Sequence, residues 1–236
     1  MFFLKKYTDS VLRQLVSPDL YYTIGERTWG SGGKYRIHYI ETKKIARWSG
    51  RDRSTRHDPS TIGAIWDGDW DKTPPKFSSI TAQPSSPLQD SETIEDSIFF
   101  ESFVDRFVNN QPWQETKVIK MLEGLIKQHG NLTWPSYGSP EKIKKKCKML
   151  DNMFYEFRDG GIESQRVRLI AAGKSIPIWE AAMEEILLDR SRDGEYLLAD
   201  GRHRIMLAKI AEIEYVPAII AVTHRMFSGG FGARER

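Results

Sequence analysis

The segment that most constrains the fold is Tyr196–Val222, near the C-terminal end of the chain. Apolar and β-branched runs at its two ends predict two strands, and the residues between them, at about 202–211, have the spacing of a helix. Asp200 and Gly201 are turn residues that stand between the first strand and the helix. A strand, a tight turn, a helix and a second strand in this order predict an α/β unit.

The first turn of this helix concentrates cationic and titratable groups, namely Arg202, His203 and Arg204. The free N–H groups of a helix start favour anions, and arginines add charge-assisted hydrogen bonds, so the pattern predicts a phosphate site. Without an anion, each cation would oppose the helix dipole at a cost of roughly a few tenths of a kcal/mol. Asp200 is expected to cap the helix, with binding of a metal or of Arg204 as the alternatives.

Composition sets the wider limits. The chain has 236 residues, of which 39% are hydrophobic, and a mean hydropathy of −0.51, which predicts a soluble protein with a substantial core. The net charge of +3 does not by itself imply a polyanionic partner. Cys147 is the one cysteine, which excludes an intramolecular disulfide and a cysteine-based metal site and favours a reduced, cytoplasmic setting. No run approaches the roughly 18 apolar residues of a membrane span, so no integral membrane association is expected.

Residues 1–91 are expected to form a β-rich region that ends in a linker. Aromatic and β-branched residues at Tyr21–Ile24 and Tyr35–Ile40 predict a hairpin across an intervening glycine cluster. Further expected elements are a short helix at 4–16, strands at 40–48 and 62–66, a polar loop at 49–60 and a Pro- and Ser-rich linker at 72–91.

Residues 92–158 are expected to form a helical segment. Apolar spacing predicts helices at about 98–110, 112–129 and 140–158, the last of them capped by Ser139. The α/β unit then occupies 159–224, and 225–236 is expected to be a flexible tail. The predicted fold class is therefore α+β, with an N-terminal β-rich region, a middle helical segment and a C-terminal α/β unit.

Three consecutive blocks carry a resemblance to a known family: Phe157–Gln165, Arg192–Arg204 and Ala208–Ala218. They contain a helix end followed by glycines, a hairpin that leads into a Gly-x-x-Arg turn, and a helix followed by an acidic turn and a Val-Pro strand. In this order they resemble the ParB N-terminal-like domain of the ParB/sulfiredoxin superfamily. The resemblance covers Tyr155–Val222 and implies a ParB/sulfiredoxin-like α/β fold for this unit.

A wider similarity, to uncharacterised archaeal proteins that carry this domain, rests on Gly68–Asp71, Pro112–Thr116 and Ser164–Arg166. It suggests one integrated architecture and supplies no activity. The chain also departs from the superfamily. Sulfiredoxins have their catalytic cysteine at the position of Arg202, so repair of peroxiredoxins is not expected. The Glu-Asn-x-Gln-Arg motif of partition-type ParB proteins does not follow Val222.

In the superfamily the Gly-x-x-Arg turn binds nucleotide phosphates: CTP in ParB proteins, ATP in sulfiredoxins and ADP in an archaeal serine kinase. Carried over to this chain, the resemblance implies that Gly201, Arg202, His203 and Arg204 bind the phosphates of ATP, ADP or CTP, accompanied by Mg²⁺. His203 is a candidate general base or phosphate ligand, and the alternative is a structural residue that forms a hydrogen bond.

The resemblance also places Glu163-Ser-Gln-Arg166 opposite the phosphate turn. Ser164, Gln165 and Arg166 would then contact the base, the ribose or a substrate. The alternative is a turn that satisfies its own backbone. Glu163 is the preferred carboxylate for a general base if the protein is a kinase or a hydrolase.

Two further clusters lie outside the α/β unit. Asp67, Asp69 and Asp71 place three carboxylates within five residues, which suggests a divalent cation, but a strand-end turn with a packing Trp70 is the preferred interpretation, so no metal site is assigned. Lys142–Lys148 is the strongest basic cluster, and a helical run of this kind is either a solvated face or a nucleic-acid contact.

The expected function is nucleotide or phosphate binding at Gly201–Arg204, coupled to hydrolysis or phosphoryl transfer, where the protein would contribute positioning and charge neutralisation. One alternative is a ParB-type DNA-associated protein without turnover that uses Lys142–Lys148 and the arginine turn. A second alternative is a regulatory module that binds an anion without catalysis. The sequence leaves the nucleotide, the acceptor, turnover and the oligomeric state open.

Overall fold

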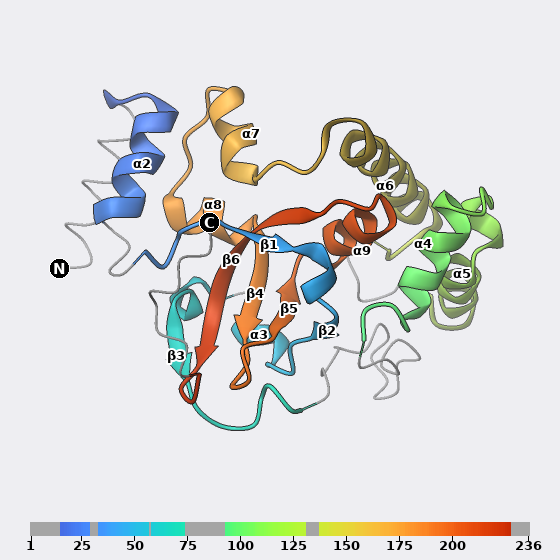
Figure 1. Ribbon diagram of the computed structural model, residues 1–236. Helices are drawn as coiled ribbons and strands as arrows, with labels where there is room; N and C mark the ends of the chain where they lie inside the picture. Colours follow the sequence, from blue (N-terminus) through green and yellow to red (C-terminus); the bar gives the residue numbers. More distant parts are fainter. Residues whose placement is uncertain (1–14, 29–32, 57, 74–92, 131–136, 228–236) are drawn as a thin grey trace.

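The computed structural model describes residues 15–28, 33–56, 58–73, 93–130 and 137–227. The predicted α+β class is confirmed, because a mixed sheet lies in the middle of the molecule with helices packed around it (Figure 1). Most of the predicted helix at 4–16, of the linker at 72–91 and of the tail at 225–236 falls outside the described residues.

Three C-terminal strands form the centre of the sheet: β4 (Ile186–Arg190), β5 (Tyr196–Asp200) and β6 (Tyr215–His224). β4 and β5 are antiparallel. The chain then passes through helix α9 (Arg202–Ile210) and returns as β6, which lies parallel to β4. Because four of the five residues in both β4 and β5 are buried, these strands are covered on both faces. The predicted strand–turn–helix–strand segment is confirmed.

The N-terminal strands extend this sheet and do not form one of their own. β1 (His38–Glu41) pairs antiparallel with the first half of β6, and β3 (Ala64–Trp66) pairs parallel with its second half. β2 (Arg47–Trp48) pairs parallel with β5, so the order is β1-β6-β4-β5-β2, with β3 beside β6. The predicted hairpin between Tyr21–Ile24 and Tyr35–Ile40 is therefore wrong.

Tyr21–Ile24 belongs to a helix, α2 (Pro18–Thr28), whose first residue is a proline, as is common at helix starts. Tyr21 and Tyr22 are buried, and their hydroxyls accept main-chain N–H groups, at 3.1 Å each, at or just before the start of helix α8 (Ile178–Met183). These tertiary contacts override the strand propensity of the aromatic residues.

The helical segment covers the face of the sheet on which α9 lies. It contains α4 (Ile98–Phe107), α5 (Lys117–His129) and α6 (Pro140–Gly160), and its apolar residues join those of α9 in one cluster. Ser97 and Ser139 cap α4 and α6 by accepting N–H groups three residues ahead, which confirms the predicted cap at Ser139.

Two predicted segments differ in detail. The single helix expected at 112–129 begins as the 3₁₀ turn η3 (Trp113–Glu115), and α5 starts afterwards because Thr116 has an extended backbone. The polar loop expected at 49–60 contains two short helical pieces and encloses Arg51, a fully buried side chain that binds Asp189 at 2.7 Å. The remaining short elements are η1 (Thr42–Lys44), α3 (Arg53–Arg56), η2 (Pro59–Thr61) and α7 (Gln165–Ala171).

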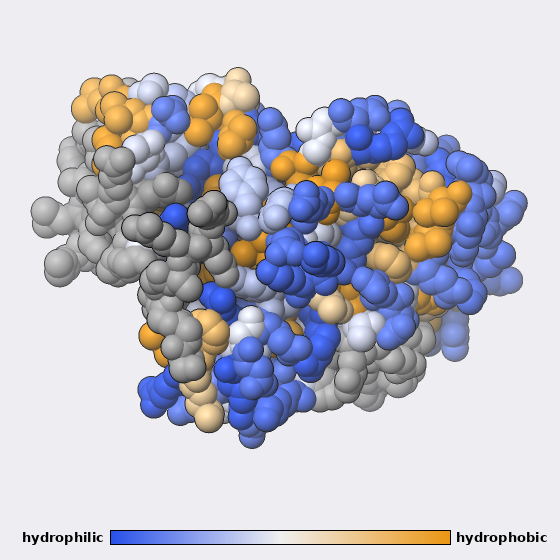
Figure 2. Space-filling view, viewed as in Figure 1, coloured by the Kyte–Doolittle hydropathy of each residue, from blue (hydrophilic) through white to orange (hydrophobic). Residues whose placement is uncertain are grey.

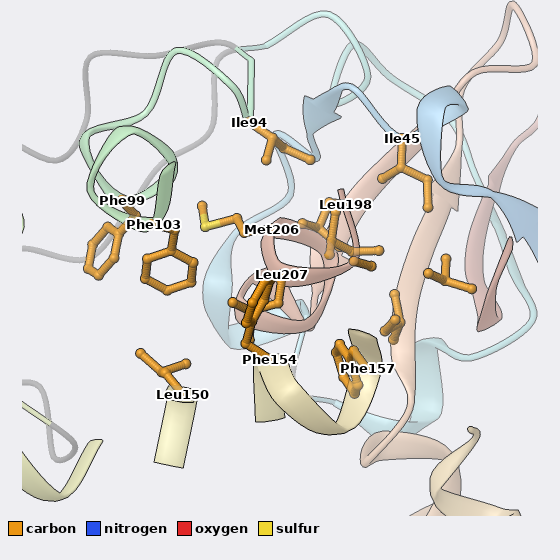
Figure 3. Close-up of a cluster of buried hydrophobic side chains, with 14 of the residues drawn as sticks. Ile45, Ile94, Phe99, Phe103, Leu150, Phe154, Phe157, Leu198, Met206 and Leu207 are labelled. Carbon is orange, nitrogen blue, oxygen red and sulfur yellow. The ribbon is translucent and has the colours of Figure 1, made fainter. Parts of the chain in front are cut away.

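Successive residues of the central strands point into two apolar clusters. Ile186 and Leu188 belong to the cluster shared with α9 and the helical segment, whereas Leu187 belongs to the cluster shared with α2 and α8. Figure 3 shows α9 inside the first cluster, with Met206 and Leu207 between α4 and α6. α9 therefore joins the sheet to the helical segment.

The surface is mostly hydrophilic on the face shown in Figure 2. Apolar side chains gather over α2 and α7, at the upper left of that view, where Leu20 and Val167 are exposed. Among the described residues no helix combines the length and the apolar character that crossing a membrane requires.

Candidate functional site

The turn between β5 and α9 depends on a glycine. Gly201 has a left-handed backbone, with φ of 92° and ψ of 22°. A Cβ at this position would lie 3.1 Å from Cγ1 and 3.2 Å from Cα of Ile186. The conformation and the close packing together require glycine. Asp200 does not cap the helix; its Oδ1 accepts the N–H of Gly201 at 2.7 Å, one residue before α9 begins.

The first turn of α9 presents free donors. No side chain caps this helix, because its N-cap residue is Gly201. Within the described parts of the chain, the main-chain N–H groups of His203 and Arg204 meet no acceptor. The helix start therefore keeps the positive end of its dipole and the donors that an anion needs.

The guanidinium of Arg204 forms hydrogen bonds within the protein. It donates to the main-chain carbonyls of Glu184, at 2.7 Å, and of Glu185, at 2.9 Å. These carbonyls lie where α8 ends and β4 begins. Arg204 therefore fastens α9 to the α8–β4 junction, and burial lowers the pKa of its guanidinium.

Glu185 organises the start of α7 and was not identified from the sequence. Its carboxylate accepts the N–H groups of Gln165 and Arg166, both at 3.0 Å, and Ser164 caps the same helix by accepting from Val167 at 3.1 Å. Burial raises the pKa of Glu185, against the lowering effect of these hydrogen bonds. The carboxylate of Glu185 therefore occupies the place at the start of α7 where an external anion could otherwise bind.

Glu185 brings two predicted segments together. Ser164, Gln165 and Arg166 meet its carboxylate, and Arg204 meets its main-chain carbonyl. In the sequence, Glu185 is visible only as an acidic residue directly before a buried strand. This position does not show which helix start its carboxylate binds.

Arg166 and Glu163 are placed differently. The Arg166 side chain is buried; it donates to the carbonyl of Tyr35 at 2.8 Å and lies 5.7 Å from the ring centre of Tyr22. Glu163 is exposed, and no hydrogen bond or ion pair joins it to α9 among the described residues. Arg166 therefore serves the packing of α2, and Glu163 is exposed just before α7.

His203 is enclosed by aromatic rings. Its Nε2 lies 2.9 Å from the hydroxyl of Tyr137, its ring stacks on Phe103 with centroids 6.1 Å apart, and Phe99 meets it edge-on. Burial, followed by the charges of Arg202 and other cations, lowers the pKa of His203 well below its usual range. The imidazole is therefore neutral at physiological pH.

Arg202 points toward the helical segment, and Lys146 of that segment lies within electrostatic range. Its guanidinium lies 4.9 Å from the ring centre of Phe99. Lys146 of α6 is half-buried, and its ammonium has one hydrogen-bond partner among the described residues, the thioether of Met149 at 3.9 Å. Burial and then Arg202 lower the pKa of Lys146. Lys146 thus lies within electrostatic range of the start of α9, on a helix that contacts α9.

The basic run and the arginine turn, which are far apart in sequence, therefore meet in the fold. Nothing in the sequence pairs Lys146 with Arg202, because the contact depends on how α6 packs against α9. The helical spacing of Cys147 and Leu150, which faces them toward the core, sets Lys146 at the edge of that buried stripe.

Two of the aspartates that follow β3 form ion pairs with an arginine. The guanidinium of Arg192, in the turn between β4 and β5, binds Asp71 and Asp69, each at 2.7 Å, and the carbonyl of Gly68 at 2.9 Å. Although burial alone would raise it, hydrogen bonds from Arg192 lower the pKa of Asp71 to about 2. His224 donates to the same Gly68 carbonyl through Nε2 at 2.8 Å.

This cluster links the turn after β3, the turn between β4 and β5, and the end of β6. It agrees with the preferred interpretation of a strand-end turn. Trp70 packs against His224, with ring centres 5.7 Å apart. Over the described residues no three His, Cys, Asp or Glu side chains are arranged to hold a metal ion.

Comparison of the chain with models of protein families, with curated proteins and with solved structures finds no significant match.

Proposed function

We propose that the start of α9, together with Arg202 and Lys146, binds a phosphate group, and that the ligand is a nucleotide, ATP, ADP or CTP, accompanied by Mg²⁺. The observation that carries the proposal is the half-buried ammonium of Lys146, whose hydrogen-bond partner among the described residues is a thioether, on a helix that packs against α9. The N–H groups of His203 and Arg204, for which the described residues provide no acceptor, lie at the start of α9.

Electrostatics supports a bound anion at this place. Two neighbouring cations disfavour each other's charged form, and the helix dipole adds a further positive partial charge. A phosphate that accepts hydrogen bonds from the main-chain N–H groups and from both side chains would neutralise the two positive charges and the positive end of the helix dipole together. Arg204 holds the helix start in place and is not needed as a direct ligand.

Turnover is a separate part of the proposal. Glu163 is the proposed base for hydrolysis or phosphoryl transfer because its carboxylate is exposed beside α7. His203 is proposed as a positioning residue, since its ring is enclosed between Phe99, Phe103 and Tyr137. Phosphate release from a bound nucleotide, lost in Glu163→Gln with nucleotide affinity retained, would support this part. Equal release by the two proteins would contradict it.

Calorimetric titration of ATP, ADP and CTP, each with Mg²⁺, tests the binding itself. The wild-type protein is expected to bind at least one of them. Lys146→Gln is expected to raise Kd about tenfold, which corresponds to one lost charge-assisted hydrogen bond of about 1.4 kcal/mol. Lys127→Gln, an exposed lysine of α5, is the matched control and should keep Kd within about twofold.

Two results would contradict the proposal. One is the absence of binding for all three nucleotides with the wild-type protein. The other is a Kd that Lys146→Gln leaves unchanged.

A further inference from the structure

The first half of α6 carries a second basic feature, distinct from Lys146. Lys142, Lys144, Lys145 and Lys148 are all exposed. Within the described residues none of their ammonium groups forms an ion pair. We call these four residues the α6 lysine face.

The second half of the same helix is different, because its charges are paired. Asp151 binds Arg106 at 3.0 Å, Glu156 binds Arg168 at 2.9 Å, and Asp159 binds its neighbour Arg158 at 2.9 Å. Glu141 is the one acidic residue in the first half of α6, where lysines outnumber it, so the excess positive charge of the helix is concentrated there.

This arrangement disfavours the helix that carries it. Lys142 and Lys145, Lys145 and Lys148, and Lys144 and Lys148 are three or four residues apart, and like charges at these spacings destabilise a helix by about 0.2–0.5 kcal/mol per pair. Cations near a helix start also oppose the dipole. Glu141, three and four residues before Lys144 and Lys145, offsets part of this cost. A polyanionic partner would turn the remaining repulsion between the lysines into attraction.

The α6 lysine face lies on a helix that contacts α9. α6 packs against α9, and Lys146, between the two, lies near Arg202. From Lys142 to Lys148 the helix rises about 9 Å, since each residue adds about 1.5 Å. The α6 lysine face therefore lies on the helix that packs against α9.

We propose that the α6 lysine face binds the phosphate backbone of nucleic acid. Lysine is a compact point charge that suits phosphate oxygens, and contacts to phosphate carry no sequence information. Because the proposed contacts are to the backbone, the affinity is expected not to depend on base sequence. It rests on the four lysines and does not require that a nucleotide bind at α9.

The test is fluorescence anisotropy with a labelled duplex DNA of arbitrary sequence over a series of salt concentrations. The slope of log K against log salt is expected to be near −3.6, because each of four phosphates contributes about −0.9. Replacing all four lysines of the face by glutamine should weaken binding at low salt at least tenfold and bring the slope close to zero. A second duplex of unrelated sequence should bind with the same Kd within about twofold.

The matched control replaces four exposed lysines elsewhere, Lys72, Lys120, Lys127 and Lys174, by glutamine and so removes the same net charge. It should retain the wild-type slope. Failure of the wild-type protein to bind DNA at low salt, an equal loss in the control, or a strong preference for one sequence would each overturn the proposal. Titration of ATP, ADP and CTP into the α6 variant separates the two sites, since loss of DNA binding with unchanged nucleotide affinity assigns the face to DNA alone.

Discussion

At the scale of single residues, the α9 start depends on Gly201 more than on any charged neighbour. Its left-handed backbone and its packing against Ile186 leave no room for a side chain. The sequence predicted this turn correctly, because an Asp-Gly pair between a strand and a helix has a local cause. It did not predict Glu185 as a site residue, and it named Lys146 only as one member of the basic run Lys142–Lys148, since the contacts of both residues come from other segments of the chain.

Gly201→Ala is expected to lower the free energy of unfolding by about 1–3 kcal/mol, through backbone strain and contact with Ile186. Chemical denaturation measures the change. Gly124→Ala is the control with the opposite sign: Gly124 lies inside α5 with nothing within 4 Å of an added Cβ, so the protein should become about 0.5–1 kcal/mol more stable. Equal effects of the two substitutions would contradict the account of the turn.

At the scale of elements, helices whose caps and apolar stripes are local were predicted well, as α4 and α6 show. α2 was predicted as a strand because its aromatic residues favour strands, and the burial of Tyr21 and Tyr22 against α8 is a tertiary fact. The end of β3 was correctly interpreted as a turn, but its partner Arg192 was missed, since it lies 121 residues away from Asp71.

The Arg192–Asp71 pair predicts how stability depends on acid. The pKa of Asp71 is lowered from 3.8 to about 2, so the ionised form stabilises the fold. This contribution, about 2 kcal/mol, is complete above pH 3.8 and is lost as the pH falls from there toward 2. Asp71→Asn should remove that part of the pH dependence, as measured by denaturation between pH 5 and 2.

Asp67→Asn is the comparison for this prediction, because Asp67 is in the same turn and its side chain is 62% exposed. It should leave the pH dependence of the wild-type protein in place. A pH profile that is the same for wild type and Asp71→Asn would show that the pair does not stabilise the fold in this way.

At the scale of the whole molecule, the decisive feature is that one sheet collects strands from residues 38–66 and 186–224. The sequence predicted strands in both ranges but not that they join, because strand pairing over such distances leaves no local pattern. The same reason hid the meeting of α6 and α9, which unites the basic run with the arginine turn. The proposed phosphate site is thus a product of the assembled fold, and no single motif contains it.

The most direct test of that claim is a two-dimensional ¹⁵N–¹H NMR titration of the labelled protein with Mg²⁺ and the nucleotide that binds. The account predicts that the amide signals of His203 and Arg204 move most, because their N–H groups would donate to phosphate oxygens. Lys146→Gln should reduce these shifts at equal nucleotide concentration. Saturable shifts that leave both amides unmoved, or no shifts at all, would contradict the assignment of the α9 start as a phosphate site.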